Sequence, residues 1–191
     1  MTHRFRLAET GTVHHRRGMK IALLIAGVVV VLVVLAGLAI YLIGRAQPER
    51  HSASIAFTLP KPRALVWAAL TDYAAMPQWW PAVKTVRFET RPNGDVITWN
   101  TDKRGQQIGF RSTEEKAPAR LVREIVGDDL PFGGMWTYEL TEEGGATRLT
   151  LTEDGFVKPP FFRGVMKFFM KPDATMRDFE QHFTPYVAAK Q

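Results

Sequence analysis

The sequence contains no cysteine, which excludes disulfide bonds, thiolate nucleophiles and cysteine-ligated zinc or iron–sulfur centres. It also has no cluster of His, Asp and Glu with the spacing of metal ligands. A phosphate-binding glycine loop and a nucleophile elbow are missing too. We therefore expect no metal, no cofactor and no identifiable catalytic residue. The redox compartment stays undetermined.

Positive charge is unevenly spread along the chain. The formal net charge is +6, and the first twenty residues contribute +4 of it, with one acid (Glu9) and five cations: Arg4, Arg6, Arg16, Arg17 and Lys20. This excess flanks an apolar run instead of covering a face of the folded part. It therefore indicates membrane topology and argues against nucleic-acid binding.

The apolar run from Ile21 to Gly44 carries no charged residue. As a helix it would be roughly 36 Å long, at about 1.5 Å per residue. That exceeds a hydrocarbon core of about 30 Å, and a lone segment in lipid must satisfy its backbone as a helix. The run predicts a transmembrane helix that binds the lipid bilayer. A cleaved signal peptide is the alternative, since Gly44-Arg45-Ala46 is a small-x-small triplet, but the run is long for a signal core.

The distribution of cations around this helix predicts the topology. Only Arg45 and Arg50 follow it closely, so residues 1–20 are expected to be a basic cytoplasmic stub and the domain to be extracytoplasmic. Counting further, to Lys61 and Arg63, nearly removes the difference. We expect residues 45–53 to be a short polar linker and residues 54–189 to form one domain.

Within that domain the predicted order is one strand, helices, a run of strands and further helices. Short Gly- and Asn-containing turns separate the strands, which makes neighbours antiparallel. Alternation within the strands gives one polar and one covered face. Asp173 is expected to cap the last helix. The expected strands are 55–59, 85–90, 96–101, 107–114, 120–126, 135–141 and 147–153, and the expected helices start at Lys61 and span 160–171 and 173–187.

Three segments resemble one known superfamily. Residues 66–86 (VWAALTDYAAMPQWWPAVKTV) resemble the opening of the START-like helix-grip superfamily, the SRPBCC or polyketide cyclase/dehydrase and lipid transport type. Residues 136–155 resemble its final hairpin, and residues 161–183 are similar to its C-terminal helix. The resemblance implies an α+β fold in which a curved antiparallel sheet wraps around a long C-terminal helix. Its members bind lipids, sterols, polyketides or hormones, and some are enzymes.

The resemblance also implies a cavity between sheet and helix, and the sequence supplies bulky apolar side chains to line it. Such a concavity is the usual form of a small-molecule site. The simpler interpretation is that these rings fill a core. The predicted ligand-binding residues are Trp80, Trp99, Phe110, Trp136, Tyr138, Met176, Phe179 and Phe183.

Arg163, Lys167 and Lys171 recur every four residues in the segment 160–171, so they form one row on a helix. This row is predicted to rest on anionic lipid headgroups. A solvated face over buried phenylalanines is the alternative. The loop 127–134, with Phe132 at its tip, is a second candidate for a gate.

Three functions remain open from the sequence. The first is a membrane-anchored binding protein for a lipid or other hydrophobic small molecule. The second is a cyclase- or dehydrase-type enzyme in which Asp102, Tyr138 or His182 would move protons, although His182 has no evident carboxylate partner. The third is a membrane-tethered interaction scaffold, which a solidly packed interior would favour.

Overall fold

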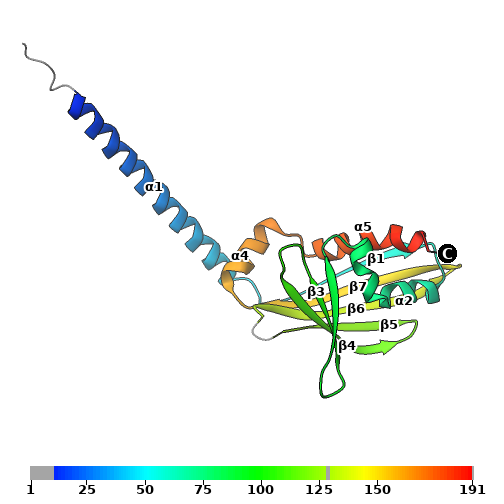
Figure 1. Cartoon of the computed structure of the whole chain (residues 1–191). Helices are drawn as coiled ribbons and strands as arrows, with labels where there is room; N and C mark the ends of the chain where they lie inside the picture. Colours follow the sequence, from blue (N-terminus) through cyan, green and yellow to red (C-terminus); the bar gives the residue numbers. More distant parts are fainter. Residues whose placement is uncertain (1–10, 128–129, 191) are drawn as a thin grey trace, which may run out of the picture.

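The computed structural model describes residues 11–127 and 130–190, with side chains from Met19 onward. A single long helix, α1 (Gly11–Arg45), projects from a compact α+β body (Figure 1). Within Met19–Arg45, an 18-residue window has a mean hydropathy of 3.2, and that window is not buried by the rest of the chain. It is long and apolar enough to cross a membrane. The helix begins ten residues before the predicted apolar run; residues 1–10 of the predicted stub lie outside the described residues.

The body is built on one seven-stranded sheet in which all neighbours are antiparallel. The spatial order is β1-β7-β6-β5-β4-β3-β2, so only the pairing of β1 with β7 joins strands distant in sequence. The strands are β1 (Arg50–Leu59), β2 (Thr85–Thr90), β3 (Val96–Thr101), β4 (Gln107–Lys116), β5 (Arg120–Val126), β6 (Phe132–Glu143) and β7 (Ala146–Val157).

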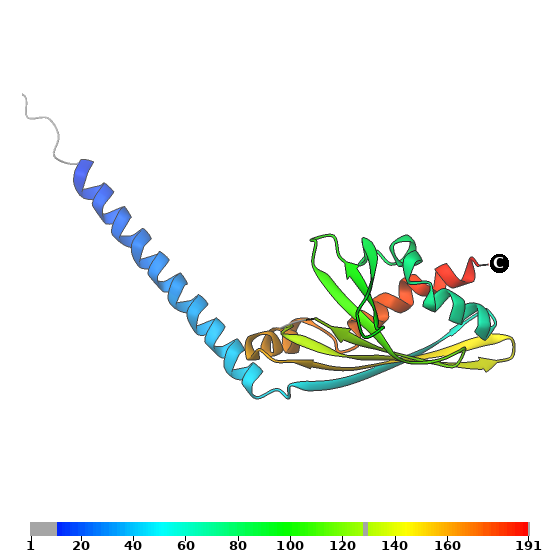
Figure 2. The same cartoon turned by 60° about the horizontal axis from the view of Figure 1, so that its bottom comes forward.

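The sheet is strongly curved. The register of β4 against β5 shifts between Ser112 and Glu114, and such a bulge bends and twists a strand. The β6–β7 hairpin turns on Gly144 and Gly145, whose φ values of 59° and 86° are those of a two-residue type I′ turn that glycine favours. Figure 2 shows the strands β2 to β4 rising on the same side of the sheet as α5, so that the sheet partly encloses this helix.

Four helical segments cover the concave face: α2 (Arg63–Thr71), η1 (Tyr73–Ala75), α3 (Met76–Trp79) and the long C-terminal α5 (Ala174–Ala188). The fold class predicted from the sequence, an α+β helix grip behind one N-terminal apolar helix, is confirmed. Apolar residues of β7 and α5 form the centre of the core, where Leu149, Leu151, Phe179 and Phe183 have no exposed surface.

The strands predicted at 135–141 and 147–153 are longer in the structure, as β6 and β7, and two further local predictions differ. Strand β1 begins at Arg50, so half of the predicted linker belongs to the sheet and only Ala46–Glu49 separates the sheet from α1. Asp173 occupies the N-cap position of α5 but makes no capping hydrogen bond, because its carboxylate accepts from Nε of Arg177 at 3.1 Å instead. The polar edge strand was missed because its outward residues resemble those of a solvated linker.

Candidate functional site

A cluster of aromatic rings occupies the space between the sheet and α5. Phe179 and Phe183 of α5 are stacked, with centroids 4.9 Å apart. Phe179 also meets Trp80, Trp136 and Tyr138 at 5.6, 6.5 and 5.8 Å. Six of the eight predicted ligand-binding residues are thereby brought together, all at most 9% exposed: Trp80, Trp136, Tyr138, Met176, Phe179 and Phe183.

These rings contact one another instead of surrounding an open space. Trp79, which the sequence analysis did not select, lies 5.5 Å from Phe179 and 5.1 Å from Phe183 and extends the cluster toward Tyr186. Edge and tilted ring contacts at 4.5–7 Å are stabilising. Under the middle of α5 the interior is therefore a packed core, as the simpler interpretation of these rings expected.

Trp99 lies on the opposite face of the sheet, contrary to the prediction. In the β3–β4 register Thr98 is paired with Phe110 and Trp99 with Gly109, so Trp99 and Phe110 cannot share a face. The indole N–H of Trp99 donates to Oε2 of Glu89 at 2.9 Å on the outer face. Phe110 does lie on the concave face, half-buried, at the margin of the ring cluster.

The concave face also holds a buried arginine that the sequence analysis missed. Arg123 is only 3% exposed, and its guanidinium carbon lies 3.9 Å from the ring centroid of Tyr73 and 5.0 Å from that of Phe110. Its Nε has no hydrogen-bond partner, and no ion pair joins it to a carboxylate in the described part of the chain. Burial lowers the pKa of the guanidinium, against the attraction of Tyr73 and Tyr138.

Further polar side chains accompany Arg123 on the same row of the sheet. Register pairs place Arg123 beside Trp136, and Trp136 beside Glu153. Glu153 lies 3.8 Å from Nε2 of His51, and burial raises the pKa of its carboxyl although His51 opposes the shift. Burial likewise raises the pKa of the Tyr138 hydroxyl. The phenolic oxygen of Tyr73 is buried without a partner as well.

The residues considered for proton transfer are not brought together. Oδ1 of Asp102 accepts two backbone N–H bonds, from Arg104 and Gln106, in the exposed turn after β3. Nδ1 of His182 lies 2.8 Å from the carbonyl oxygen of Asp178 on its own helix and 3.5 Å from Oδ1 of the same residue, so a carboxylate does lie beside it, contrary to the expectation. Only Tyr138 reaches the interior. Among the described residues no group of three His, Asp or Glu side chains gathers to hold a metal ion.

The predicted cationic row does not form a single exposed surface. Arg163 of α4 (Pro160–Phe169) is 9% exposed, and its Nε donates to the carbonyl oxygen of Gly44 at 3.0 Å. Its Nη1 donates to the carbonyl oxygens of Val157 and Lys158. The prediction is therefore wrong for Arg163, which joins α4 to the end of α1. Lys167 and Lys171 are exposed.

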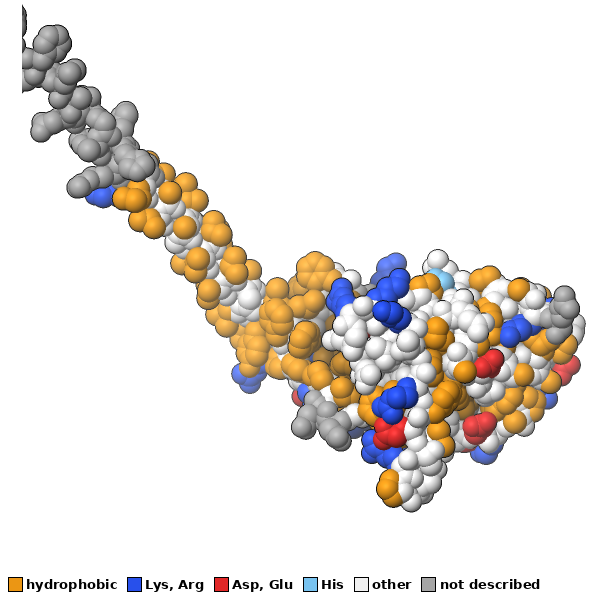
Figure 3. Space-filling model, in the orientation of Figure 1, with side chains coloured by type: hydrophobic (Ala, Val, Ile, Leu, Met, Phe, Trp, Pro, Cys, Tyr) orange, Lys and Arg blue, Asp and Glu red, His pale blue; other side chains and the backbone are white. Residues whose placement is uncertain are grey.

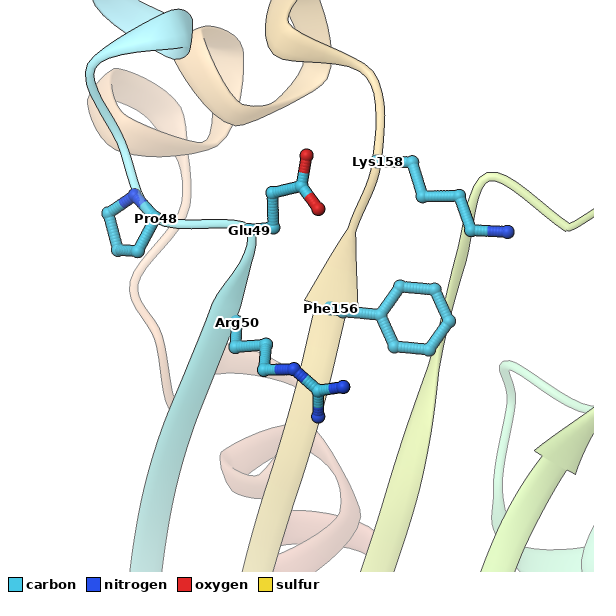
Figure 4. A pocket seen from close by; sticks show the side chains of 5 residues that line it. All are labelled: Pro48, Glu49, Arg50, Phe156 and Lys158. Atoms are coloured by element: carbon cyan, nitrogen blue, oxygen red, sulfur yellow. The ribbon is translucent and has the colours of Figure 1, made fainter.

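The predicted gate, loop 127–134, and a surface hollow complete the description of the site. Phe132 belongs to β6, while Asp128 and Asp129 of the gate lie outside the described residues. An open hollow of about 530 Å³ lies near the start of β1 (Figure 4). It is lined by Pro48, Glu49, Arg50, Phe156 and Lys158, and thus is not the space between sheet and α5.

Comparison with known families agrees with this architecture. The family model for polyketide cyclase/dehydrase and lipid transport matches residues 50–183. The chain belongs to this family. Its match begins at the first residue of β1, so the family domain includes the strand that the sequence analysis assigned to the linker. No curated protein matches the chain.

Solved structures of the START-like superfamily share the fold. The Zhui aromatase/cyclase from Streptomyces sp. R1128 is 14% identical, with a TM-score of 0.58 over 72% of this chain and 93% of that chain. A START superfamily protein from Mycobacterium smegmatis is 16% identical, with a TM-score of 0.53 over 72% and 97%. Norcoclaurine synthase from Thalictrum flavum is 12% identical, with a TM-score of 0.56 over 72% and 94%. At such identities the likeness establishes the fold alone.

Proposed function

We propose that this family member is a membrane-anchored binding protein for a hydrophobic molecule that carries an anionic group, and that Arg123 receives this group. One observation carries the proposal: Arg123 is only 3% exposed, lies on the concave face and has an unpartnered Nε. Buried charges in proteins are normally paired, because an unpaired one loses its hydration without compensation. A carboxylate or phosphate of a ligand would supply the missing partner, bonded by a guanidinium whose fork suits either group.

The surroundings of Arg123 suit the apolar part of such a ligand. Phe110 and Ile125 are register partners on the concave face, and both are half-buried, unlike the closed rings under α5. They extend the apolar surface from the ring cluster toward β4. Small-molecule sites combine a mainly apolar lining with a few placed polar groups, which is the composition found here. The ring cluster would then line one side of the binding site, and the ligand would not bind within the cluster itself.

Retention of α1 as an anchor is supported by the packing at its C-terminal end. Gly44 is buried against α4, and its carbonyl oxygen accepts from Nε of Arg163. Cleavage at the triplet Gly44-Arg45-Ala46 would remove this contact from the folded domain. With α1 retained, the domain works within a few residues of the bilayer.

The test uses the full chain purified in detergent, incubated with a total lipid extract and examined by native mass spectrometry. We expect bound anionic lipids or fatty acids, and their loss in Arg123→Met. Arg120→Met is the matched control: it removes the same charge from the same strand, but from a half-buried residue that is paired with Glu114 and Glu139. Equal binding by Arg123→Met would remove the role of Arg123. A wild-type chain that binds no lipid would end the binding proposal.

A tethered interaction scaffold is the second candidate. The packing of Trp79, Trp80, Phe179 and Phe183 into one continuous ring cluster favours it, because rings in mutual contact leave little space under α5. It predicts that the chain stays free of lipid in the experiment above and instead retains a membrane protein on a detergent-compatible affinity column. The two outcomes separate the candidates.

A further inference from the structure

The short helix α4 has two chemically different sides. One side, with Pro160, Arg163 and Gly164, packs against the end of α1. The other presents large apolar side chains that the rest of the chain leaves uncovered. Their exposed fractions are 44% for Phe161, 54% for Phe162, 59% for Phe168 and 76% for Phe169, and that of the following Met170 is 51%. These five residues form what we call the α4 apolar face.

Close backbone contact fixes the position of α4 along α1. A Cβ atom added to Gly44 would lie 1.7 Å from the carbonyl oxygen of Pro160, and one added to Gly164 would lie 2.1 Å from that of Ile40. The two helices therefore run antiparallel, and α4 starts at the end of α1 and leads back along it. Gly164 lies beside a residue four positions before Gly44, about 6 Å closer to the middle of the apolar run.

The joint between the two helices leaves few polar groups unsatisfied. The guanidinium of Arg163 is bonded to the carbonyl oxygens of Gly44, Val157 and Lys158, and lies 3.4 Å from Glu49. In α4 itself the amide N–H groups from Arg163 to the C-cap Met170 have helical carbonyl partners, and Pro160 at the first position has no N–H. Figure 3 shows the hydrophobic surface of α1 continuing without a break onto the adjoining part of the body, where Figure 1 places α4.

We propose that α4 is a second membrane-seated element: its apolar face enters the hydrocarbon of the leaflet that surrounds the C-terminal end of α1. An exposed patch of four phenylalanines and a methionine is unusual on a water-facing surface and typical of a membrane-contacting one. Lys167 and Lys171 are exposed, and their long stems allow the ammonium groups to reach the headgroups. This inference rests on the proposed anchoring by α1, and it adds that the domain is held at two points.

Absence of cysteine from the chain allows a direct test with single labelled cysteines. Phe169→Cys probes α4, Leu32→Cys probes the middle of α1, and Glu142→Cys probes the distant end of β6. Each is labelled with an environment-sensitive fluorophore in the full chain and reconstituted into phosphatidylcholine vesicles. Fluorescence quenching is measured with lipids that carry a spin label either near the headgroup or near the chain end. These lipids are present in both leaflets, so the result does not depend on the orientation of the chain.

We expect the label at residue 169 to be quenched by the lipid spin labels, with emission shifted to shorter wavelength. The label at residue 32 should be quenched most by the chain-end spin label, and the label at residue 142 by neither. A label at residue 169 that behaves like the one at residue 142, while residue 32 is quenched, overturns the seating of α4. Loss of quenching at residue 32 as well overturns the anchor itself.

Discussion

Helices α4 and α5 follow one another in the chain, and both carry phenylalanines at helical spacing, yet the rings meet different surroundings. Phe179 and Phe183 of α5 are fully buried against the sheet, whereas Phe161, Phe168 and Phe169 of α4 are exposed. A hydrophobic stripe in a sequence indicates that a surface is to be covered. It does not say what covers that surface: the sheet covers the rings of α5, whereas no described part of the chain covers those of α4.

The largest expected effect is that of removing a ring from α5. We expect Phe179→Ala to lower the free energy of unfolding by about 3–5 kcal/mol, because a buried ring leaves a cavity among its neighbours. Phe169→Ala, at an exposed position, should change it by less than about 0.5 kcal/mol. Chemical denaturation of both variants in detergent measures the difference. Equal losses would mean that α4 is also covered by protein.

Arg163→Met is expected to give the second-largest loss of stability. It leaves the carbonyl oxygens of Gly44, Val157 and Lys158 without their donor in a buried joint, which we expect to cost about 2–3 kcal/mol. Lys167→Met, four residues along the same helix, is the exposed control. Limited proteolysis of the Ala46–Glu49 segment measures how often the joint opens. Unchanged proteolysis of the Arg163 variant would show that glycine packing alone holds α4.

Gly164→Val should separate α4 from α1 with a smaller effect on the sheet. The added side chain meets the carbonyl oxygen of Ile40, so α4 must shift, at a cost of about 1–3 kcal/mol. Gly37→Val is the matched control, because nothing lies within 4 Å of its added Cβ. Spin-label distances between α1 and α4 measure the displacement. Unaltered distances in the Gly164 variant would contradict the close contact.

The smallest effect concerns charge on the concave face covered by α5. Because the pKa of Glu153 is raised, the folded state prefers the protonated carboxyl, so stability is greater at low pH and falls as pH rises above the ordinary carboxyl pKa. Glu153→Gln stays neutral and should be more stable than wild type at about pH 7 but not at about pH 4. Unfolding free energies at the two pH values test this. A pH-independent difference would contradict it.

The order and class of the elements could be predicted because local signals determine them. Turns at Asn93-Gly94 and Gly144-Gly145 delimit hairpins, and alternation identifies strands such as 96–101, whose bounds agree with β3. The same alternation could have identified Arg123. It shares a strand face with Leu121 and Ile125, so the sequence places a charged residue among apolar residues of the covered face.

The remaining errors concern relations between elements. Alternation says which residues of one strand share a face, but the side on which Trp99 lies depends on its pairing with Gly109, which only the register determines. The four-residue spacing of Arg163 and Lys167 defines one helix face without saying that α1 covers part of it. Likewise, the sequence lists the rings under α5, while the space left between them depends on how their side chains pack.

The segment between anchor and sheet has consequences for how the domain meets its partners. With only Ala46–Glu49 between α1 and β1, and with Arg163 bonded across the joint, the domain has no flexible tether on which to sweep through the solution. Under the proposed anchoring by α1, the helix sets the height of the domain above the lipid and the direction of its concave face. A lipid ligand would then reach this face by diffusing within the plane of the membrane, so its rate of encounter would depend on surface density.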